Sequence, residues 1–280
     1  MTATYKRHST KRLQDALYSS LAVIIQRHPS LSAVITDVET SAPRFVRLCS
    51  IDLDRVVTIV TQDDEPDLDA ILQEQHNLPF RLESPFLPLW RVHVVTQAID
   101  SSTFALSFVF HHSIADTKSA LIFLEDLEGT LGSQTSSLTS PIVVTPTLPL
   151  PPTLESVCPL LLSPGFLETQ RDPMRIPDNV WSGTLQFLPV KTRFNSHFLP
   201  RQTTIAFQTL SKRKGVSVTS ALMALFASAL FHILPDCYTR VQGDCAVSLR
   251  HFLSPHVARR DMGSWVGSFS QSYSRFEDSV

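Results

Sequence analysis

The sequence predicts a mixed α/β protein, and three observations carry this prediction. Segments with a helical spacing of apolar residues alternate along the chain with short runs of β-branched residues. One of these runs, at residues 103–112, has apolar side chains on both faces, which is typical of a strand inside a sheet. A chain of 280 residues can also bury a sizeable core. We therefore expect one large domain or two medium domains that contain both helices and sheets.

The first expected element is an amphipathic helix within residues 10–28. Four apolar residues fall on one helical stripe: Leu13, Leu17, Leu21 and Ile24. Thr10 can cap the start of this helix, and the helix ends before Pro29. The stripe predicts that one face of the helix packs on the core.

Strands are expected after this helix, because β-branched runs follow it. The runs that we expect to form strands occupy residues 32–36, 44–48, 55–62, 88–97 and 103–112. A helical pattern interrupts them from Asp67 to Asn77. The last of these strands is expected to lie in the centre of a sheet because both of its faces are apolar.

A second long helix is expected at residues 117–131, directly after Asp116. Asp116 is a good N-cap residue for it. The helix is expected to end near Gly129 or Gly132, since glycine readily ends a helix. Three leucines are candidates for its core-facing side: Leu121, Leu124 and Leu127.

The middle of the chain has a different composition. Residues 133–164 are rich in Ser, Thr, Pro and Leu, which predicts a long crossover on the surface of both halves. The many Leu and Val residues in it make a plain disordered linker the weaker alternative. The expected organisation is an N-terminal half at residues 1–132, a crossover at residues 133–180 and a partial C-terminal half at residues 181–280.

The C-terminal half is expected to contain both kinds of element. Residues 203–215 predict a strand and a short helix that Gly215 ends. The apolar block at residues 218–235 predicts a buried core helix capped at Thr219 or Ser220. The strands expected after it occupy residues 245–253 and 264–274.

Composition excludes several classes of function. The chain has 24 Lys and Arg residues and 26 Asp and Glu residues, spread without long runs of one sign. It therefore lacks the positive electrostatic potential that binding to nucleic acid or to an anionic membrane requires. The N-terminus has no apolar stretch of the kind that a secretory signal needs. The longest apolar block, residues 221–234, is too short to span a bilayer. We therefore expect a cytoplasmic protein with no transmembrane span, whose partners are small or neutral.

The cysteines and glycines exclude further chemistry. Cys49, Cys158, Cys237 and Cys245 show no spacing that closes a zinc site, and reduced, unpaired thiols are expected. The eight glycines form no dinucleotide-binding motif, no phosphate-binding Walker loop and no serine-hydrolase elbow. The sequence therefore predicts neither a metal site nor a permanently bound cofactor.

The strongest chemical signal is the segment FVFHHSIADTKSA at residues 108–120. Adjacent residues on an extended chain point to opposite faces, so His111 and His112 cannot both bind one metal ion without a sharp bend. A histidine at the end of a buried strand can face a cleft while its backbone is held in place. An imidazole with a pKa of about 6.5 accepts a proton at neutral pH. The segment therefore contains either a general base or a structural pair, with one histidine in the core and the other on the surface, and a metal site is the weakest alternative.

The segment HHSIAD at residues 111–116 resembles the His-His-x-x-x-Asp motif of the CoA-dependent acyltransferase superfamily, which includes chloramphenicol acetyltransferase, the plant acyltransferases and the condensation domains of nonribosomal peptide synthetases. Four further segments follow the order of that family: RHPSL at 27–31, PLWRVHVV at 88–95, VSLRHFL at 247–253 and MGSWVGSFS at 262–270. SIADTKS, together with LPPTLESV at 150–157, is most similar to the fungal alcohol acetyltransferase family.

The resemblance implies a chloramphenicol-acetyltransferase-like fold of two-layer mixed sheets with helices, and it implies a reaction. His112 would be the general base that takes the proton from a small or medium alcohol as its oxygen attacks an acyl-CoA thioester. The expected co-substrate is acyl-CoA, in particular acetyl-CoA. His111 would be a neighbour of the base, and Asp116 would hold the loop by pairing with Arg250, which the resemblance places on a strand.

The chain departs from the family pattern in three ways. Thr117 stands where the family has glycine, the opening strand before the first helix is expected to be missing, and the Asp-Phe-Gly-Trp-Gly segment is absent. The second domain is therefore expected to be truncated, with bare apolar surface. Two other functions stay open, namely an inactive relative that binds a ligand or partner, and a condensation-type module that takes acyl groups from a carrier protein.

Overall fold

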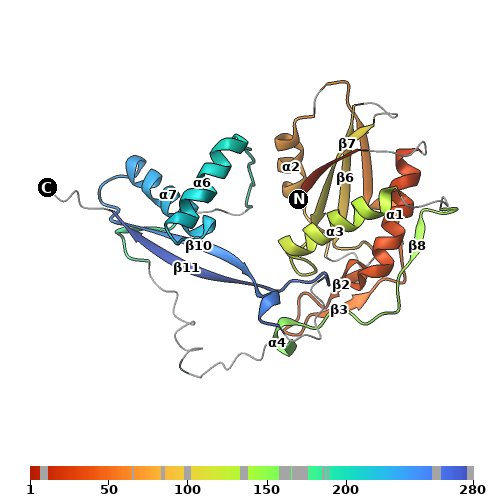
Figure 1. The fold of residues 1–280 in the computed structure, drawn as a ribbon. Helices are drawn as coiled ribbons and strands as arrows, with labels where there is room; N and C mark the ends of the chain where they lie inside the picture. The colour runs from red at the N-terminus through yellow and green to blue at the C-terminus, as the bar shows by residue number, and fades with distance from the viewer. Residues whose placement is uncertain are drawn as a thin grey trace. The chain divides into compact units, whose positions relative to one another are not determined.

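The chain forms two compact units in the computed structural model (Figure 1). The described residues are 1–6, 12–64, 66–82, 86–97, 102–132, 138–157, 165, 176–184, 187, 189–253 and 260–275. The first unit consists of Met1–Pro159, Lys191–Phe194 and Ser248–Val266. The second consists of Leu160–Val190, Asn195–Val247 and Gly267–Val280. Each unit is therefore discontinuous in sequence, and the fold is mixed α/β as predicted.

A four-stranded sheet forms the centre of the first unit. In spatial order its strands are β1 (Thr2–Lys6), β7 (Thr103–Phe110), β6 (Trp90–Thr96) and β5 (Val57–Thr61). β7 pairs antiparallel with both β1 and β6, whereas β5 runs parallel to β6. The prediction that the strand at residues 103–112 is central is confirmed, because β7 has a paired strand on each side.

The prediction that an opening strand is missing is wrong, because β1 pairs with β7 along its whole length. The Tyr5 ring stacks on Phe104 with the ring centroids 5.5 Å apart, and the Tyr5 hydroxyl donates to the Leu124 carbonyl at 3.0 Å. The backbone of Met1 accepts from the Phe108 amide at 2.9 Å. Only Tyr5 is buried among the five residues of β1, so the strand has almost no alternating pattern of its own.

Three long helices belong to the first unit: α1 (Leu13–Arg27), α2 (Leu68–Asn77) and α3 (Thr117–Leu131). The predicted stripe of α1 is buried, and α1 packs on α3. The Phe123 ring of α3 stacks on Phe108 of β7 with centroids 3.8 Å apart, so α3 packs on the sheet. Thr10 lies outside the described residues, and the residue directly before α1 is Arg12, whose side chain makes no capping hydrogen bond.

The ends of α2 and α3 follow the sequence signals. The side chain of Asp67 accepts from the Ala70 amide at the start of α2, and α3 ends at Gly132. Leu124 and Leu127 are buried as expected, but Leu121 is 40% exposed. The prediction for Leu121 is wrong because the buried side of α3 is rotated toward Ile122 and Phe123, which are both fully buried.

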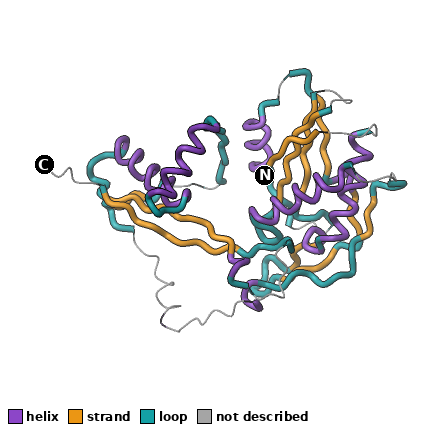
Figure 2. The backbone as a smooth tube through the Cα atoms, viewed as in Figure 1, coloured by secondary structure: helices purple, strands orange, loops and turns teal. Residues whose placement is uncertain are grey.

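Short elements complete the first unit (Figure 2). They are the 3-10 turns η1 (Pro29–Ser32), η2 (Leu53–Arg55) and η3 (Leu249–His251), the paired strands β2 (Ala33–Thr36) and β3 (Arg44–Arg47), the paired strands β4 (Ser50–Asp52) and β8 (Ile142–Val144), and helix α4 (Leu154–Val157). β8 and α4 lie in the Ser-, Thr- and Pro-rich segment. The described part of that segment therefore contains regular structure, and β8 is bound to β4 through Ile51 and Val143.

The second unit contains a three-stranded sheet and two helices. The strands lie in the order β11 (Val266–Ser274), β10 (Arg240–Ser248) and β9 (Val180–Trp181), and the helices are α6 (Arg201–Arg213) and α7 (Val218–Ile233). The prediction of a strand at the start of residues 203–215 is wrong, since α6 is one continuous helix with an amphipathic pattern. Gly215 follows α6 with a φ of +69°, in the left-handed region that favours glycine.

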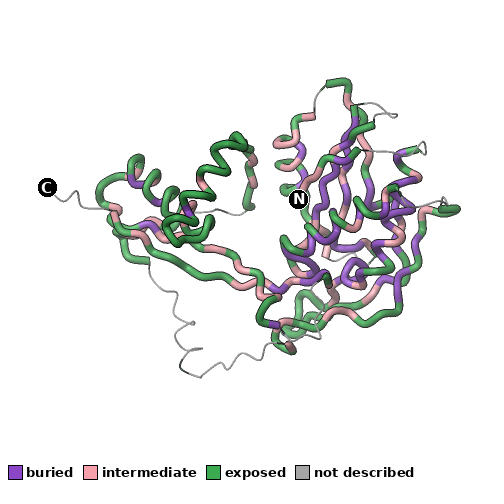
Figure 3. Tube along the Cα trace, in the orientation of Figure 1, coloured by how far each residue is buried: buried purple, intermediate pink, exposed green. Residues whose placement is uncertain are grey.

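The predicted buried core helix, α7, is mostly exposed (Figure 3). Only Ala227 and Phe231 are buried, while Phe226 and Ile233 are 67% and 78% exposed. Its N-cap is Ser217, which accepts from the Ser220 amide, and not Thr219 or Ser220. The error has a physical cause: an all-apolar helix predicts burial on every side, but the described residues of the second unit cover one side only.

The bare apolar surface that was expected is therefore present on the second unit. In the described part of the chain no single helix is long and apolar enough to cross a membrane, although α6 and α7 taken together meet the criterion with a bend of 103° between them. The cysteines among the described residues, Cys49, Cys237 and Cys245, are unpaired as expected. Cys158 lies outside those residues.

Candidate active site

The two adjacent histidines lie in a turn that follows β7 directly. The His111 amide donates to the Leu89 carbonyl at 2.8 Å, and the Ile114 amide donates to the His111 carbonyl at 3.2 Å. These backbone bonds hold the turn at the point where the chain leaves the sheet. His111 is half-buried and His112 is exposed, so the two imidazole rings lie in different environments.

The ring of His111 is engaged within the turn. The Ser113 amide donates to its Nδ1 at 3.2 Å, and the Ser113 hydroxyl lies 2.8 Å from the same atom. A backbone amide can only donate, so Nδ1 is the accepting nitrogen and the neutral ring carries its proton on Nε2. Burial, and then the nearby His112, lowers the pKa of His111 below 6.5, which favours the neutral form.

The ring of His112 is free by comparison. It forms no hydrogen bond with any described residue. It contacts the Phe110 ring edge to face, with the ring centroids 6.0 Å apart. Its two nitrogens are therefore available to a bound molecule. Of the two histidines, His112 is the exposed one, and its ring makes no hydrogen bond with a described residue.

Asp116 connects the turn to α3. It is 3% exposed, and its Oδ1 accepts from the Ser119 amide at 2.8 Å and lies 2.9 Å from the Ser119 hydroxyl. This is the predicted N-cap of α3. Thr117 is the first residue of α3, and Asp37 is the one residue other than glycine with a positive φ among the described residues. Threonine in place of the family glycine therefore causes no backbone strain here.

The other carboxylate oxygen of Asp116 binds Arg250, as the resemblance implied. Arg250 Nη1 donates to Asp116 Oδ2 at 2.5 Å, and the two side chains are 5% and 4% exposed. Arg250 lies in η3, directly after β10, so its expected place on a strand is wrong. The 3-10 turn directs the guanidinium back to α3, where Nη2 donates to the Ser119 hydroxyl at 2.9 Å.

The Asp116–Arg250 pair also organises the chain near Trp265. The Trp265 amide donates to Asp116 Oδ2 at 3.2 Å, and the guanidinium carbon of Arg250 lies 5.0 Å from the Trp265 ring centroid. The Gly263 amide donates to the Ser119 hydroxyl at 3.0 Å. We did not predict Ser119 and Trp265 as members of this network, and only their presence in the motifs SIADTKS and MGSWVGSFS could have indicated them.

A second polar cluster, which is only partly buried, joins α1 to α3 and was also missed. His28 Nε2 lies 2.8 Å from Asp126 Oδ2, and Arg260 Nη2 donates to Asp126 Oδ1 at 2.7 Å. His28 belongs to the RHPSL segment and follows the last residue of α1, so this cluster ties the end of α1 to α3. Among the described residues, no three His, Cys, Asp or Glu side chains lie close enough to hold a metal ion.

Acid is expected to weaken the first unit through Asp116. Burial opposes ionisation of this carboxyl, but the hydrogen bond from Arg250, the Ser119 amide and the Arg250 charge together lower its pKa below 3.8. A carboxyl whose pKa is lower in the folded than in the unfolded protein stabilises the fold at any pH above its unfolded-state pKa. This contribution is lost as the pH falls through its folded-state pKa. The stability advantage of the wild type over Asp116→Asn is therefore expected to shrink below about pH 3.8.

Urea unfolding midpoints, measured from neutral pH downward, test this expectation. Asp63→Asn, which removes an exposed carboxyl, is the matched control and is expected to follow the wild type at every pH. A constant difference between the wild type and Asp116→Asn across the acid range contradicts the assignment.

Gly263 is expected to tolerate no side chain. A Cβ at this position would lie 2.8 Å from the Trp265 ring, which is 1% exposed and whose Nε1 is hydrogen-bonded to the Pro152 carbonyl. Gly263→Ala is therefore expected to lower the free energy of unfolding by about 1–3 kcal/mol through overpacking, measured by urea unfolding. Gly129→Ala is the control, because no atom lies within 4 Å of its Cβ position inside α3. Equal stability of the two variants would show that the ring moves freely.

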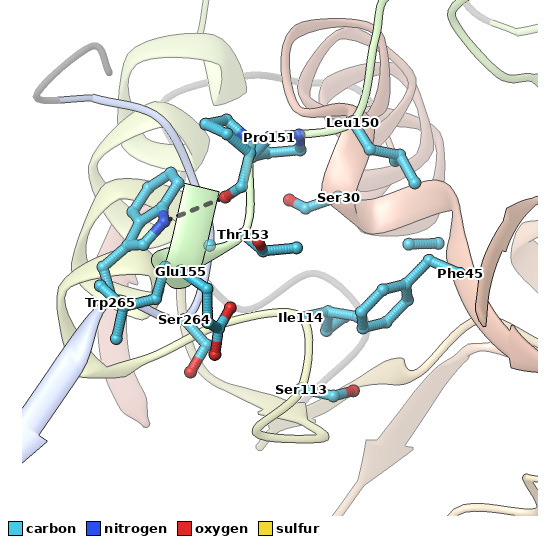
Figure 4. Close-up of a pocket in the computed structure, with 14 residues that line it drawn as sticks. Ser30, Phe45, Ser113, Ile114, Leu150, Pro151, Thr153, Glu155, Ser264 and Trp265 are labelled. Atoms are coloured by element: carbon cyan, nitrogen blue, oxygen red, sulfur yellow. Dashed lines mark hydrogen bonds between the residues drawn. The ribbon is translucent and has the colours of Figure 1, made fainter. Parts of the chain in front are cut away.

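A cavity of about 300 Å³ lies next to the turn, in the first unit (Figure 4). Its walls come from the turn, η1, the β2–β3 pair, the segment around α4 and the segment Gly263–Trp265 that precedes β11. The residues are Ser30, Ala33, Phe45, Ser113, Ile114, Leu150, Pro151, Pro152, Thr153, Leu154, Glu155, Gly263, Ser264 and Trp265. Trp265 Nε1 donates to the Pro152 carbonyl at 3.2 Å, which closes one side. His112 follows the sheet on the same turn but is not a wall residue.

Residues 2–141, half of the chain, match the model of the condensation domain family. The chain is 29% identical over 285 residues to a probable alcohol acetyltransferase, crmB, of Aspergillus fumigatus, a match that covers 95% of this chain and 60% of that protein. The chain therefore spans about 60% of the length of this relative.

Two solved structures show the same fold. The TRI3 trichothecene 15-O-acetyltransferase of Fusarium sporotrichioides superposes with a TM-score of 0.68 at 14% identity, covering 98% of this chain and 60% of that one. The first condensation domain of the calcium-dependent antibiotic synthetase superposes with a TM-score of 0.64 at 14% identity, covering 98% of this chain and 64% of that one.

Proposed function

Because the chain belongs to the condensation domain family, we propose that it is an O-acyltransferase that moves an acyl group from acyl-CoA to the hydroxyl of a small or medium alcohol. The observation that supports this most is the difference between the two histidines. His111 is bound to Ser113 within the turn, whereas the His112 ring makes no hydrogen bond with a described residue and lies on a turn held by backbone hydrogen bonds. One available imidazole on a fixed backbone is what a general base requires.

The proposed reaction needs only proton transfers at His112. The imidazole takes the hydroxyl proton as the alcohol oxygen bonds to the thioester carbonyl carbon. The tetrahedral intermediate then breaks its C–S bond, and the same imidazole returns the proton to the departing sulfur, so that the products are an ester and CoA thiol. Asp116 does not orient the base in this scheme, because both of its oxygens are bound to Arg250, Ser119 and Trp265.

The names of the relatives favour acyl-CoA as the donor. The Aspergillus relative is named an acetyltransferase of alcohols, and the Fusarium structure is named an O-acetyltransferase. Acetyl-CoA is therefore the first donor to test, and no permanently bound cofactor enters the scheme. An acyl group on a carrier protein is the alternative donor, since condensation domains of synthetases share the fold. A cytoplasmic location stays a prediction.

A thiol-release assay tests the proposal. The full chain is incubated with acetyl-CoA and with each of a panel of primary, secondary and aromatic alcohols, while free thiol and ester are measured together. The expected result is equal formation of CoA and ester that depends on the alcohol. CoA release without an alcohol indicates hydrolysis. No turnover with acetyl-CoA, but transfer from an acylated carrier protein, would replace the proposed donor.

A non-catalytic relative that binds a ligand is the second candidate, and one observation favours it. The cavity beside the turn does not include His112 among its walls. Tight binding of a ligand with no ester formed from any donor would support this candidate over the transferase.

A further inference from the structure

The cavity beside the turn contains a buried hydroxyl that has no partner. Ser30 is 4% exposed, and its Oγ forms no hydrogen bond with any described residue. Figure 4 shows this hydroxyl directed toward the interior of the ring of labelled side chains. Buried polar groups are nearly always hydrogen-bonded, because an unpaired one lowers the stability of the fold. A partner supplied by a bound molecule accounts for its position.

The remaining walls define the chemistry of such a molecule. The larger side chains around the space are apolar: Phe45, Ile114, Leu150, Leu154 and Trp265. Phe45 is 44% exposed, so the cavity opens to solvent on that side. Among the described wall residues the one charged side chain is Glu155, an exposed carboxylate that disfavours anions. The described wall residues include no cationic group, so neither a phosphate nor a carboxylate is expected to bind.

We propose that this cavity is a binding site for a neutral, mainly hydrocarbon molecule that carries one oxygen function, which the Ser30 hydroxyl binds. The volume of about 300 Å³ is at the small end of ligand pockets. An apolar cavity of about 150 Å³ holds one benzene molecule, so this space accommodates a group of about twice that size. The site does not include His112, and its occupation does not depend on acyl transfer.

Heavy-atom quenching of tryptophan fluorescence tests the site in the full chain, since Trp265 forms one wall. Three probes of equal chain length are titrated: 6-bromohexan-1-ol, 1-bromohexane and 6-bromohexanoate. We expect saturable quenching by the neutral alcohol and little or none by the carboxylate. Because fluorescence quenching measures binding and not turnover, its outcome does not depend on whether the transferase proposal is correct.

Ser30→Ala decides the role of the hydroxyl. The variant is expected to bind 6-bromohexan-1-ol about threefold to tenfold more weakly, the loss of one hydrogen bond, while its affinity for 1-bromohexane stays the same. Its melting temperature without a ligand is not expected to fall, since the lost hydroxyl has no partner in the protein. Equal affinity of the variant and the wild type for the alcohol overturns the proposal.

Two further variants control the test. Ser20 is also a fully buried serine whose hydroxyl has no partner among the described residues, but it does not line the cavity. Ser20→Ala is therefore expected to leave the binding of all three probes unchanged. Ala33→Leu is expected to fill the space and to abolish saturable quenching. Undiminished quenching in a folded Ala33→Leu protein places the probes elsewhere and also overturns the proposal.

Discussion

The His112→Ala variant is expected to form ester from acyl-CoA and an alcohol about 10²- to 10⁴-fold more slowly than the wild type, which is the usual contribution of a general base. The ring is exposed and makes no hydrogen bond with the described residues, so its loss removes a proton acceptor and almost no packing. The free energy of unfolding is therefore expected to change by less than about 0.5 kcal/mol. The thiol-release assay and urea unfolding measure the two quantities.

The combination of a large kinetic effect with an unchanged stability separates a chemical role from a structural one. His232→Ala is the matched control, because His232 is an exposed histidine on α7. It is expected to retain wild-type turnover. An active His112→Ala protein would remove His112 as the base and would leave the transferase proposal without its central residue.

The Arg250→Ala variant is expected to lose about 3–5 kcal/mol of stability, the usual cost of removing one partner from a buried ion pair. The substitution leaves the Asp116 carboxylate buried without its cation, and it also removes a donor to the Ser119 hydroxyl. The wild-type pair need not add that much net stability, since desolvation of both charges offsets their attraction. Urea unfolding at neutral pH measures the difference.

The matched control is Arg260→Ala, which breaks an ion pair to Asp126 in the same unit. The Arg260 side chain is 64% exposed, and such pairs contribute up to about 1 kcal/mol. An Arg250→Ala protein that is as stable as Arg260→Ala would mean that the buried pair does not hold the turn. The rate of ester formation is also expected to be lower in Arg250→Ala than in the wild type, because a displaced turn moves His112.

The local pattern of the sequence is sufficient for most elements of the first unit. The stripe of α1 is buried because spacing along a helix determines which side chains share a face. The interior position of β7 follows from its two apolar faces, and the cap of α3 follows from an aspartate directly before the helical pattern. The prediction that Asp116 pairs with Arg250 came from the family resemblance, and no local pattern indicated it.

The sequence by itself therefore determined most elements of the first unit and the motif that contains the proposed base. Only the tertiary structure decided the place of β1, the exposure of α7, the Trp265 contact to Asp116 across 149 residues of chain, and the unpaired hydroxyl of Ser30 in a cavity. The physical reason is the range of the interactions. Helix and strand patterns depend on neighbours a few residues away, whereas burial and hydrogen bonding depend on which distant segments pack against each residue.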